Sequence, residues 1–399
     1  MECKKTVVVG VTGGIAVYKA LDVISRLRKR NIGIHVIMTK SACEFVNPLS
    51  FQSLSQNMVI TDMFNEPKHW EIQHISLAKK ADLMLIVPAT ANIIGKIANG
   101  IADDMLSTTI MATKAPVVFA PAMNTNMYTN PIVENNINKL KEYGYKFIEP
   151  EAGRLACGDT GKGKLANTEL IAEIVESMLY PVKDLLGKKV LVTAGPTMAP
   201  IDPVRYITNK SSGKMGYAIA EEARDRGAEV TLISGPTSIK EPFGMKVLNV
   251  KTNEEMFNEV LRHFPEQQIV IKAAAVSDFK PKEYSDKKIK KASDDLHLEL
   301  VKDADILKRL GELKKSQVLV GFAAESNDLI ENAQIKLQKK NLDYIVANDI
   351  TGEGIGFASE ENKVTILCKD GRKIPMNKMS KRQVAEEIFN LINEERKHE

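Results

Sequence analysis

Cysteine is scarce in this sequence, and its spacing excludes two classes of protein. The 399 residues include four cysteines, Cys3, Cys43, Cys157 and Cys368, and no two of them form a CxxC pair. Small disulfide-stabilised domains and zinc ribbons both depend on closely spaced cysteines. The spacing therefore favours a protein of a reducing compartment.

Long apolar runs and a large excess of one charge are also missing. No run reaches the roughly 20 residues of a membrane helix, and the apolar run from Thr6 to Val11 is too short for the core of a signal peptide. The net charge is only +4, which predicts no nucleic-acid or membrane surface. We therefore expect a cytoplasmic protein whose partners are small molecules.

The sequence does contain enough apolar material for more than one hydrophobic core. Hydrophobic residues make up 44% and charged residues 27% of the chain, both ordinary values for globular proteins. At about 150 residues per domain, this length predicts two large domains.

Strand-like runs alternate with helix-like segments in both halves of the chain. In the first half, strands are expected at 6–11, 34–39, 83–88, 117–121 and 145–149. In the second half, they are expected at 190–193, 230–233, 269–275, 318–323 and 344–347, followed by a hairpin around Asp370-Gly371 and an amphipathic helix over 384–392. Such alternation is typical of α/β domains with parallel, doubly wound sheets. We predict domains over 1–180 and 189–399, joined by a linker over 181–188.

Both halves begin with a strand that runs into glycine. Gly13-Gly14 follows the first strand, and Gly195 follows the strand that opens the second half. Backbone N–H groups at such a turn can bind phosphate beside a helix N-terminus, although a plain tight turn has the same pattern. Because Gly10, Gly13 and Gly14 do not form GxGxxG, a mononucleotide such as FMN fits better than NAD.

The glycine-rich stretch Gly158 to Leu165 is close to a P-loop but lacks two of its parts. Leu165 stands where a hydroxyl is needed for Mg²⁺, and no strand precedes the stretch. We therefore predict a flexible flap just after Cys157 that can close over a substrate.

Residues 1 to about 180 resemble the flavin-containing cysteine decarboxylases. Those enzymes have a reactive histidine, a PASANT box, a PxMNxxMW box and a cysteine-bearing flap. The matching residues are His74, 88–93, 121–128 and 153–163. Thr90 and Ile93 depart from the first box, and Tyr128 replaces the usual tryptophan of the second. By local pattern alone, His74 would be a structural residue at a helix start.

This resemblance implies an FMN-dependent decarboxylation, in which oxidation of the CH₂–SH carbon creates a C=S group that accepts the electrons left by CO₂. It implies that His74 is the base near the thiol, that Asn124 holds the carboxylate or amide of the substrate, and that Cys157 supplies a proton on reduction. Met127 is expected to contact the substrate. The expected FMN contacts are Gly13, Gly14, Ile15, Thr39, Thr90, Asn92 and Ser107.

The second half resembles phosphopantothenate–cysteine ligases through 209–216, 273–278 and 288–291. The resemblance implies that CTP and Mg²⁺ convert 4'-phosphopantothenate to an acyl-cytidylate, from which the cysteine amine displaces CMP. It assigns Asn209 to the acyl-cytidylate and Arg205 to the substrate, and Asp278 could face Mg²⁺ or cytosine. The expected CTP contacts are Ala273, Ala274, Asp278, Lys288, Lys302, Asp305, Phe322, Lys336 and Lys340.

Several of these features also fit a simpler interpretation. The lysines at 287, 288, 290 and 291 could form a solvated loop, and Asn209 could be a turn residue. The first half could be an electron carrier, or could act on the C-terminal cysteine of a peptide. In this order, however, the two halves resemble bifunctional coenzyme A biosynthesis enzymes. That resemblance implies a homo-oligomer of trimeric decarboxylase and dimeric ligase units, with a dodecamer as the expected assembly.

Overall fold

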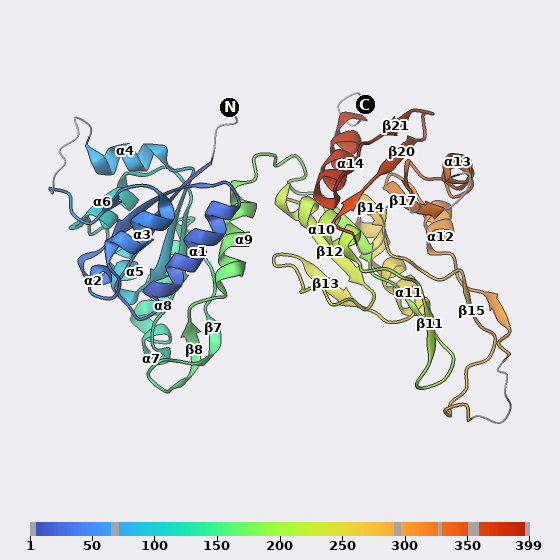
Figure 1. The fold of residues 1–399 in the computed structure, drawn as a ribbon, viewed down its shortest axis with the longest axis horizontal. Helices are drawn as coiled ribbons and strands as arrows, with labels where there is room; N and C mark the ends of the chain where they lie inside the picture. Colours follow the sequence, from blue (N-terminus) through green and yellow to red (C-terminus); the bar gives the residue numbers. More distant parts are fainter. Residues whose placement is uncertain (1–4, 65–71, 291–296, 326–328, 350–358, 396–399) are drawn as a thin grey trace. The chain divides into compact units, whose positions relative to one another are not determined.

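The computed structural model describes residues 5–64, 72–290, 297–325, 329–349 and 359–395. The chain divides into two compact units, Met1–Tyr180 and Pro181–Glu399 (Figure 1). Each unit has its own central sheet with a hydrophobic core on each face.

The first unit is built on a parallel sheet with the strand order β3-β2-β1-β4-β5-β6. Its strands are β1 (Thr6–Val11), β2 (Gly33–Met38), β3 (Val59–Ile60), β4 (Leu83–Ala89), β5 (Val117–Pro121) and β6 (Lys146–Phe147). β3 adds only a two-residue edge, and the other five strands have the flavodoxin-like order. The predicted α/β fold class is therefore confirmed.

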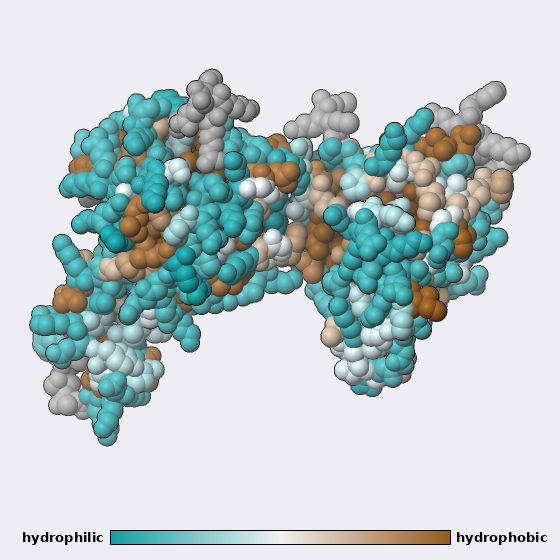
Figure 2. All heavy atoms as spheres, turned by 180° about the vertical axis from the view of Figure 1, so that it is seen from behind, coloured by the Kyte–Doolittle hydropathy of each residue, from teal (hydrophilic) through white to brown (hydrophobic). Residues whose placement is uncertain are grey.

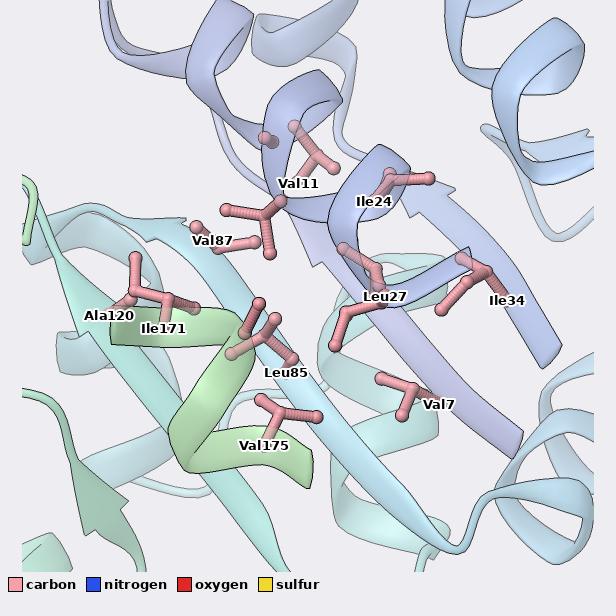
Figure 3. Close-up of a cluster of buried hydrophobic side chains, with 14 of the residues drawn as sticks. Val7, Val11, Ile24, Leu27, Ile34, Leu85, Val87, Ala120, Ile171 and Val175 are labelled. Carbon is pink, nitrogen blue, oxygen red and sulfur yellow. The ribbon is translucent and has the colours of Figure 1, made fainter. Parts of the chain in front are cut away.

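Helices cover both faces of this sheet. One face carries α1 (Val17–Lys29), α3 (Pro48–Ser55) and α9 (Thr168–Leu179), and the other carries α4 (Gln73–Lys80), α5 (Ala91–Ala98), α6 (Met105–Ala112) and α8 (Pro131–Glu142). Alternate side chains of a strand point to opposite faces. Val7 and Val11 of β1 therefore belong to the core on the face covered by α1 and α9, with Leu27 and Val175 (Figure 3), whereas Val8 joins the opposite core.

The second unit is built on a sheet with the strand order β13-β12-β9-β14-β17-β18-β20-β21. Its strands are β9 (Lys189–Ala194), β12 (Glu229–Ser234), β13 (Lys246–Asn249), β14 (Ile269–Lys272), β17 (Val318–Glu325), β18 (Tyr344–Asp349), β20 (Val364–Cys368) and β21 (Lys373–Pro375). The six strands from β13 to β18 are parallel and have the order of a Rossmann fold. The predicted hairpin is β20–β21, and the predicted closing helix is α14 (Lys381–Glu395).

The remaining elements of the second unit lie on the faces and at the edge of its sheet. Helices α10 (Lys214–Asp225) and α14 pack on one face, and α11 (Asn253–His263), α12 (Ile306–Leu313) and α13 (Leu329–Lys339) pack on the other. Two small two-stranded ribbons, β10 (Met198–Pro200) with β11 (Tyr206–Thr208) and β15 (Phe279–Pro281) with β16 (Leu300–Lys302), extend away from the sheet (Figure 1). A third ribbon pairs β19 (Glu361–Asn362) with β22 (Met379–Ser380).

Hydrophilic side chains cover most of the face shown in Figure 2, and the hydrophobic ones form separate patches. Among the described residues, we find no helix that is both long and apolar enough to cross a membrane.

The segment 181–188, which we expected to be a linker, packs against the second unit. Leu185 is fully buried in the core on the α10 face, and its N–H donates to the carbonyl of Arg226 (3.1 Å). The ammonium of Lys183 donates to the carbonyl of Asp225 (2.6 Å). This segment is therefore held in place by both apolar and polar contacts.

A buried arginine joins this segment to α10 and α14. The Arg226 side chain is 1% exposed, and its Nε lies 2.7 Å from Oε1 of the fully buried Glu222. Its Nη1 lies 3.1 Å from Oδ2 of Asp184, and its Nη2 donates to Oδ1 of Asn390 (2.6 Å). One guanidinium thus connects three parts of the second unit.

We expect Arg226→Met to lower the free energy of unfolding of the second unit by about 3 kcal/mol, because it leaves the Glu222 carboxylate buried without this partner. Hydrogen exchange of the β9 and β12 amides, followed by mass spectrometry, would measure the change. Arg262→Met is the matched control, since Arg262 is 61% exposed and pairs with Glu259 on the surface of α11. Equal effects of the two substitutions would contradict a special role for the buried pair.

Candidate active sites

A cavity of about 1500 Å³ lies at the carboxyl ends of β1, β2, β4 and β5 in the first unit. Small-molecule sites usually measure about 300 to 1000 Å³, so this cavity can hold a cofactor and a substrate together. It is lined by 12–16, 38–41, 61–64, 88, 90–93, 96, 103–106, 122–124, 127, 154–157 and 163–165, with Tyr18 and Lys19.

The buried Thr12 connects two of the lining segments. Its hydroxyl donates to the carbonyl of Pro88 (2.7 Å) and accepts from the N–H of Thr90 (3.1 Å). These bonds hold the turn at Gly13 next to the start of α5. Gly13 itself lies so close to Ser41 that a Cβ would be 2.4 Å from the Ser41 Cβ, so a side chain at this position would displace the segment after β2.

Six of the seven residues expected to contact FMN line this cavity, and one does not. Gly13, Gly14, Ile15, Thr39, Thr90 and Asn92 are lining residues, as are Asn124, Met127 and Cys157. The seventh, Ser107, is fully buried in a capping box at the start of α6, where its N–H donates to Oδ1 of Asp104 (2.8 Å) and its hydroxyl accepts from the N–H of Asp104 (3.1 Å). His74 lies in α4 and is not among the lining residues.

Asn124 and Cys157 both contact a third residue, Asp159, which lies in the flap motif but was not among the expected site residues. The Asn124 amide nitrogen donates to Oδ2 of Asp159 (2.8 Å) and lies 3.3 Å from the Cys157 sulfur. The Cys157 thiol lies 3.4 Å from the same Asp159 oxygen. The side-chain oxygen of Asn124 accepts from the N–H of Asn126 (2.8 Å) at the start of α7 (Thr125–Tyr128).

The segment that carries Cys157 is a β-hairpin, where a flexible loop was expected. Strands β7 (Glu151–Arg154) and β8 (Thr160–Lys164) pair antiparallel. The N–H of Met123 donates to the carbonyl of Gly163 (3.0 Å). Gly163 has φ +144°, and a Cβ there would lie 2.4 Å from the Met123 carbonyl oxygen. The hairpin can therefore approach the residue before Asn124 only with glycine at this position.

Tyr128 also fastens this hairpin to α7. Its hydroxyl donates to Oε2 of Glu149 (3.0 Å), which also lies 2.8 Å from the ammonium of Lys162 in β8. Burial opposes ionisation of Glu149, but bonds from Lys162, Lys141 and Tyr128 lower its pKa to about 2. The tyrosine that stands in place of the usual tryptophan thus adds a hydrogen bond to the base of the flap.

In the second unit, three of the expected ligase residues, Ala273, Ala274 and Asn209, lie where the strand order reverses, between β9 and β14. The N–H of Ala273 donates to the carbonyl of Thr193, and the N–H of Ala274 donates to the Thr193 hydroxyl (both 3.2 Å). The amide of Asn209 donates to the carbonyl of Ala275 (3.1 Å). β14 ends at Lys272, three residues earlier than expected, so these alanines form the loop that follows the strand.

A lysine that was not predicted lies among four of the expected CTP contacts. Burial lowers the pKa of Lys272 to about 8, and its electrostatic neighbours are Lys340, Asp305, Asp278 and Lys336. The ammonium of Lys340 lies 2.8 Å from Oδ2 of Asp305. Phe322 lies on β17, the strand beside β14, and Lys302 is exposed on the ribbon strand β16.

Asp202 connects the β10–β11 ribbon to the loop that carries Lys287, Lys288 and Lys290. Its Oδ2 lies 3.2 Å from Nη1 of Arg205 and accepts from the N–H of Ile289 (3.2 Å), the residue after Lys288. Burial opposes ionisation of Asp202, but hydrogen bonds from the N–H groups of Val204, Arg205 and Ile289 lower its pKa. Arg205 and the backbone beside Lys288 are thus brought together, whereas Lys291 lies outside the described residues.

Asp278 is the one residue that we expected to face Mg²⁺. Within the described parts of the chain, no three His, Cys, Asp or Glu side chains are grouped so that they could hold a metal ion. Magnesium in nucleotide sites is often held by one or two carboxylates together with phosphate oxygens. Among the described residues, Asp278 is therefore not part of an all-protein metal cage.

Comparison with known proteins identifies both units. Residues 1–179 match the family described as Flavoprotein, and residues 185–395 match the DNA/pantothenate metabolism flavoprotein C-terminal domain. The coenzyme A biosynthesis bifunctional protein CoaBC of Bacillus subtilis is 51% identical over 97% of this chain and 96% of its own length. The chain belongs to this bifunctional family.

Another relative of the same name, from Borreliella burgdorferi, is 45% identical over 98% of this chain and all of its own length. A solved C-terminal domain of CoaBC is 43% identical, with a TM-score of 0.47 over 54% of this chain and 100% of its own. Membership of this bifunctional family confirms the predicted activities, with a flavoprotein decarboxylase in the first unit and a ligase in the second.

The Lys272 surroundings predict a pH dependence of the ligase. A lysine with a pKa of about 8 is charged below this pH and neutral above it, so its attraction for the triphosphate of the expected CTP would be lost as the pH rises through 8. We expect the KM for the nucleotide to rise several-fold between pH 7 and 9 in the parent enzyme. Lys272→Met should have a high KM that changes much less with pH.

Steady-state ligation at fixed ionic strength would test this expectation. Lys282→Met serves as a control, because Lys282 pairs with Glu299 on the surface of the β15–β16 ribbon. A Lys272→Met enzyme that keeps the pH dependence of the parent would contradict it.

Proposed function

We propose that the first unit uses FMN to convert 4'-phosphopantothenoylcysteine to 4'-phosphopantetheine, and that the second uses CTP and Mg²⁺ to join 4'-phosphopantothenate to L-cysteine. The observation that carries the first half is the cluster of Asn124 and Cys157 at a cavity that the Gly13-Gly14 turn also lines. Membership of the bifunctional family supports both halves.

In the first unit, the N–H groups of the turn after β1 would bind the FMN phosphate, together with the other expected lining residues. FMN, when bound, supplies the oxidation of the CH₂–SH carbon and the return of a hydride. Asn124 would hold the substrate carboxylate, and Cys157 would protonate the enethiolate that CO₂ loss leaves. We propose His74 as the base near the thiol. Ser107 would affect FMN binding indirectly, by fixing the start of α6 through its capping box.

In the second unit, the free carboxylate of 4'-phosphopantothenate must be activated before an amine can attack it. Asn209 would hold the acyl-cytidylate, with Arg205 binding the substrate beside it. Lys288 would neutralise charge as pyrophosphate leaves, and Asp278 would hold Mg²⁺. The remaining expected contacts, Ala273, Ala274, Lys302, Asp305, Phe322, Lys336 and Lys340, would bind CTP.

We further propose that the chain works in the cytoplasm as a homo-oligomer of trimeric decarboxylase and dimeric ligase units. The family resemblance supports a dodecamer, and light scattering of the full chain would measure its size.

The spectrum and the products of the first unit test the decarboxylase. The purified protein should be yellow, release FMN on denaturation and form CO₂ from 4'-phosphopantothenoylcysteine. Cys157→Ser should still release CO₂ but accumulate reduced flavin and an enethiol product, because a hydroxyl is a much weaker acid than a thiol with its usual pKa of about 8.5. Parent-level formation of 4'-phosphopantetheine by this variant would remove Cys157 from the mechanism.

Lys288→Gln should separate the two activities. One charge contact made mainly in the transition state contributes about 3 kcal/mol, or on the order of a hundredfold in rate, so CTP-dependent pyrophosphate release should fall by that factor. CO₂ release from 4'-phosphopantothenoylcysteine should be unchanged. Lys287→Gln, on the same loop, is the matched control. Normal ligation by Lys288→Gln would favour a solvated loop, and loss of both activities would indicate a structural residue.

A further inference from the structure

One carboxylate oxygen of Asp159 contacts both Asn124 and Cys157, the two residues proposed to act on the substrate. Oδ2 of Asp159 accepts from the Asn124 amide (2.8 Å) and lies 3.4 Å from the Cys157 sulfur. A bond between an amide donor and an ionised carboxylate is stronger than one between neutral groups. This contact is therefore a substantial competitor for anything else that binds Asn124.

The hydrogen-bonding capacity of Asn124 is already in use within the protein. An asparagine side chain offers two N–H donors and one carbonyl acceptor. The nitrogen faces Asp159 and Cys157, and the oxygen accepts from Asn126. A ligand can therefore take the amide donor of Asn124 that faces Asp159 only if the Asp159 carboxylate gives it up.

The position of Asp159 allows this exchange without unfolding the hairpin. Asp159 is exposed and lies in the short connection between β7 and β8. Its backbone carbonyl accepts from the N–H of Leu155 (2.8 Å), which closes the connection independently of the side chain. Rotation of the carboxylate alone would break its contacts with both Asn124 and Cys157.

We propose that Asp159 is a specificity-determining residue whose carboxylate occupies the place of the substrate carboxylate until the substrate binds. This inference rests on the proposed function of the first unit. The substrate brings a group of the same charge and geometry, which can accept the same two bonds, whereas a ligand without a carboxylate cannot compensate for their loss. Once CO₂ has left, the product no longer competes for Asn124, and Asp159 returns to it.

The proposal predicts an effect on affinity that depends on the ligand. In the FMN-loaded full chain, Asp159→Asn should lower the Kd of 4'-phosphopantothenoylserine about fivefold, because the competing charged acceptor is gone. This analogue keeps the carboxylate but has a hydroxyl in place of the thiol. The Kd of its decarboxylated counterpart, the ethanolamine amide, should not change. Asp159→Ala should also lower the Kd of the serine analogue. This second variant separates loss of the carboxylate from any effect of the amide that asparagine introduces.

Titration followed by the flavin absorbance would give both dissociation constants. Asp62→Asn is the matched control, since Asp62 lines the same cavity but its Oδ1 accepts from the N–H of Phe64 (2.9 Å), two residues along the chain. If the effect came only from the charge of the cavity, Asp62→Asn and Asp159→Asn would lower the Kd of the serine analogue equally. That result, or an unchanged or higher Kd of the serine analogue in both Asp159 variants, would overturn the proposal.

The proposed function is tested separately by the parent protein. Absence of FMN binding and of CO₂ release in the parent would reject the decarboxylase mechanism. Normal activity of the parent together with unchanged ligand selectivity of the Asp159 variants would reject only the role of Asp159.

Discussion

A parallel sheet brings the carboxyl ends of all its strands to one edge, and both proposed sites depend on this constraint. In the first unit, the Thr12 hydroxyl bonds there to Pro88 and Thr90, which lie 76 and 78 positions further along the chain. In the second unit, Thr193 at the end of β9 receives the N–H groups of Ala273 and Ala274 after β14. At both edges, side chains and loops complete a site that the two strands begin.

The two units use this edge for different chemistry. The first lines a cavity with glycine turns, amides and a thiol, which suit a reaction through a flavin. The second brings Lys272, Lys336 and Lys340 near Asp278 and Asp305, a set of charges that the proposed nucleotidyl transfer could use. A common architecture therefore supports a decarboxylation and a ligation because the functional groups come from the loops and are not dictated by the sheet.

The sequence predicted the sheets well because hydrophobic strands alternating with amphipathic helices are a local signal. It also located Gly13, Thr90, Asn124 and Cys157, because motifs of neighbouring residues carry them. It missed Thr12, Asp159, Lys272 and Asp202, whose importance comes from partners far along the chain or across a loop. It predicted a flexible flap over 158–165, because glycines in β8 hide the strand pattern and the pairing with β7 is not local. The roles of the site residues stay predictions.

The buried Arg226 has a consequence for how the two halves could have been joined during evolution. Its partner Asp184 and the core residue Leu185 lie before β9, so the second unit starts at Pro181 and not at the first strand of its sheet. A gene for a free-standing ligase would need to encode this leading segment, or else replace its contacts. The fusion point compatible with both folds therefore lies immediately after α9, where one hydrophobic core has ended and the next has not begun.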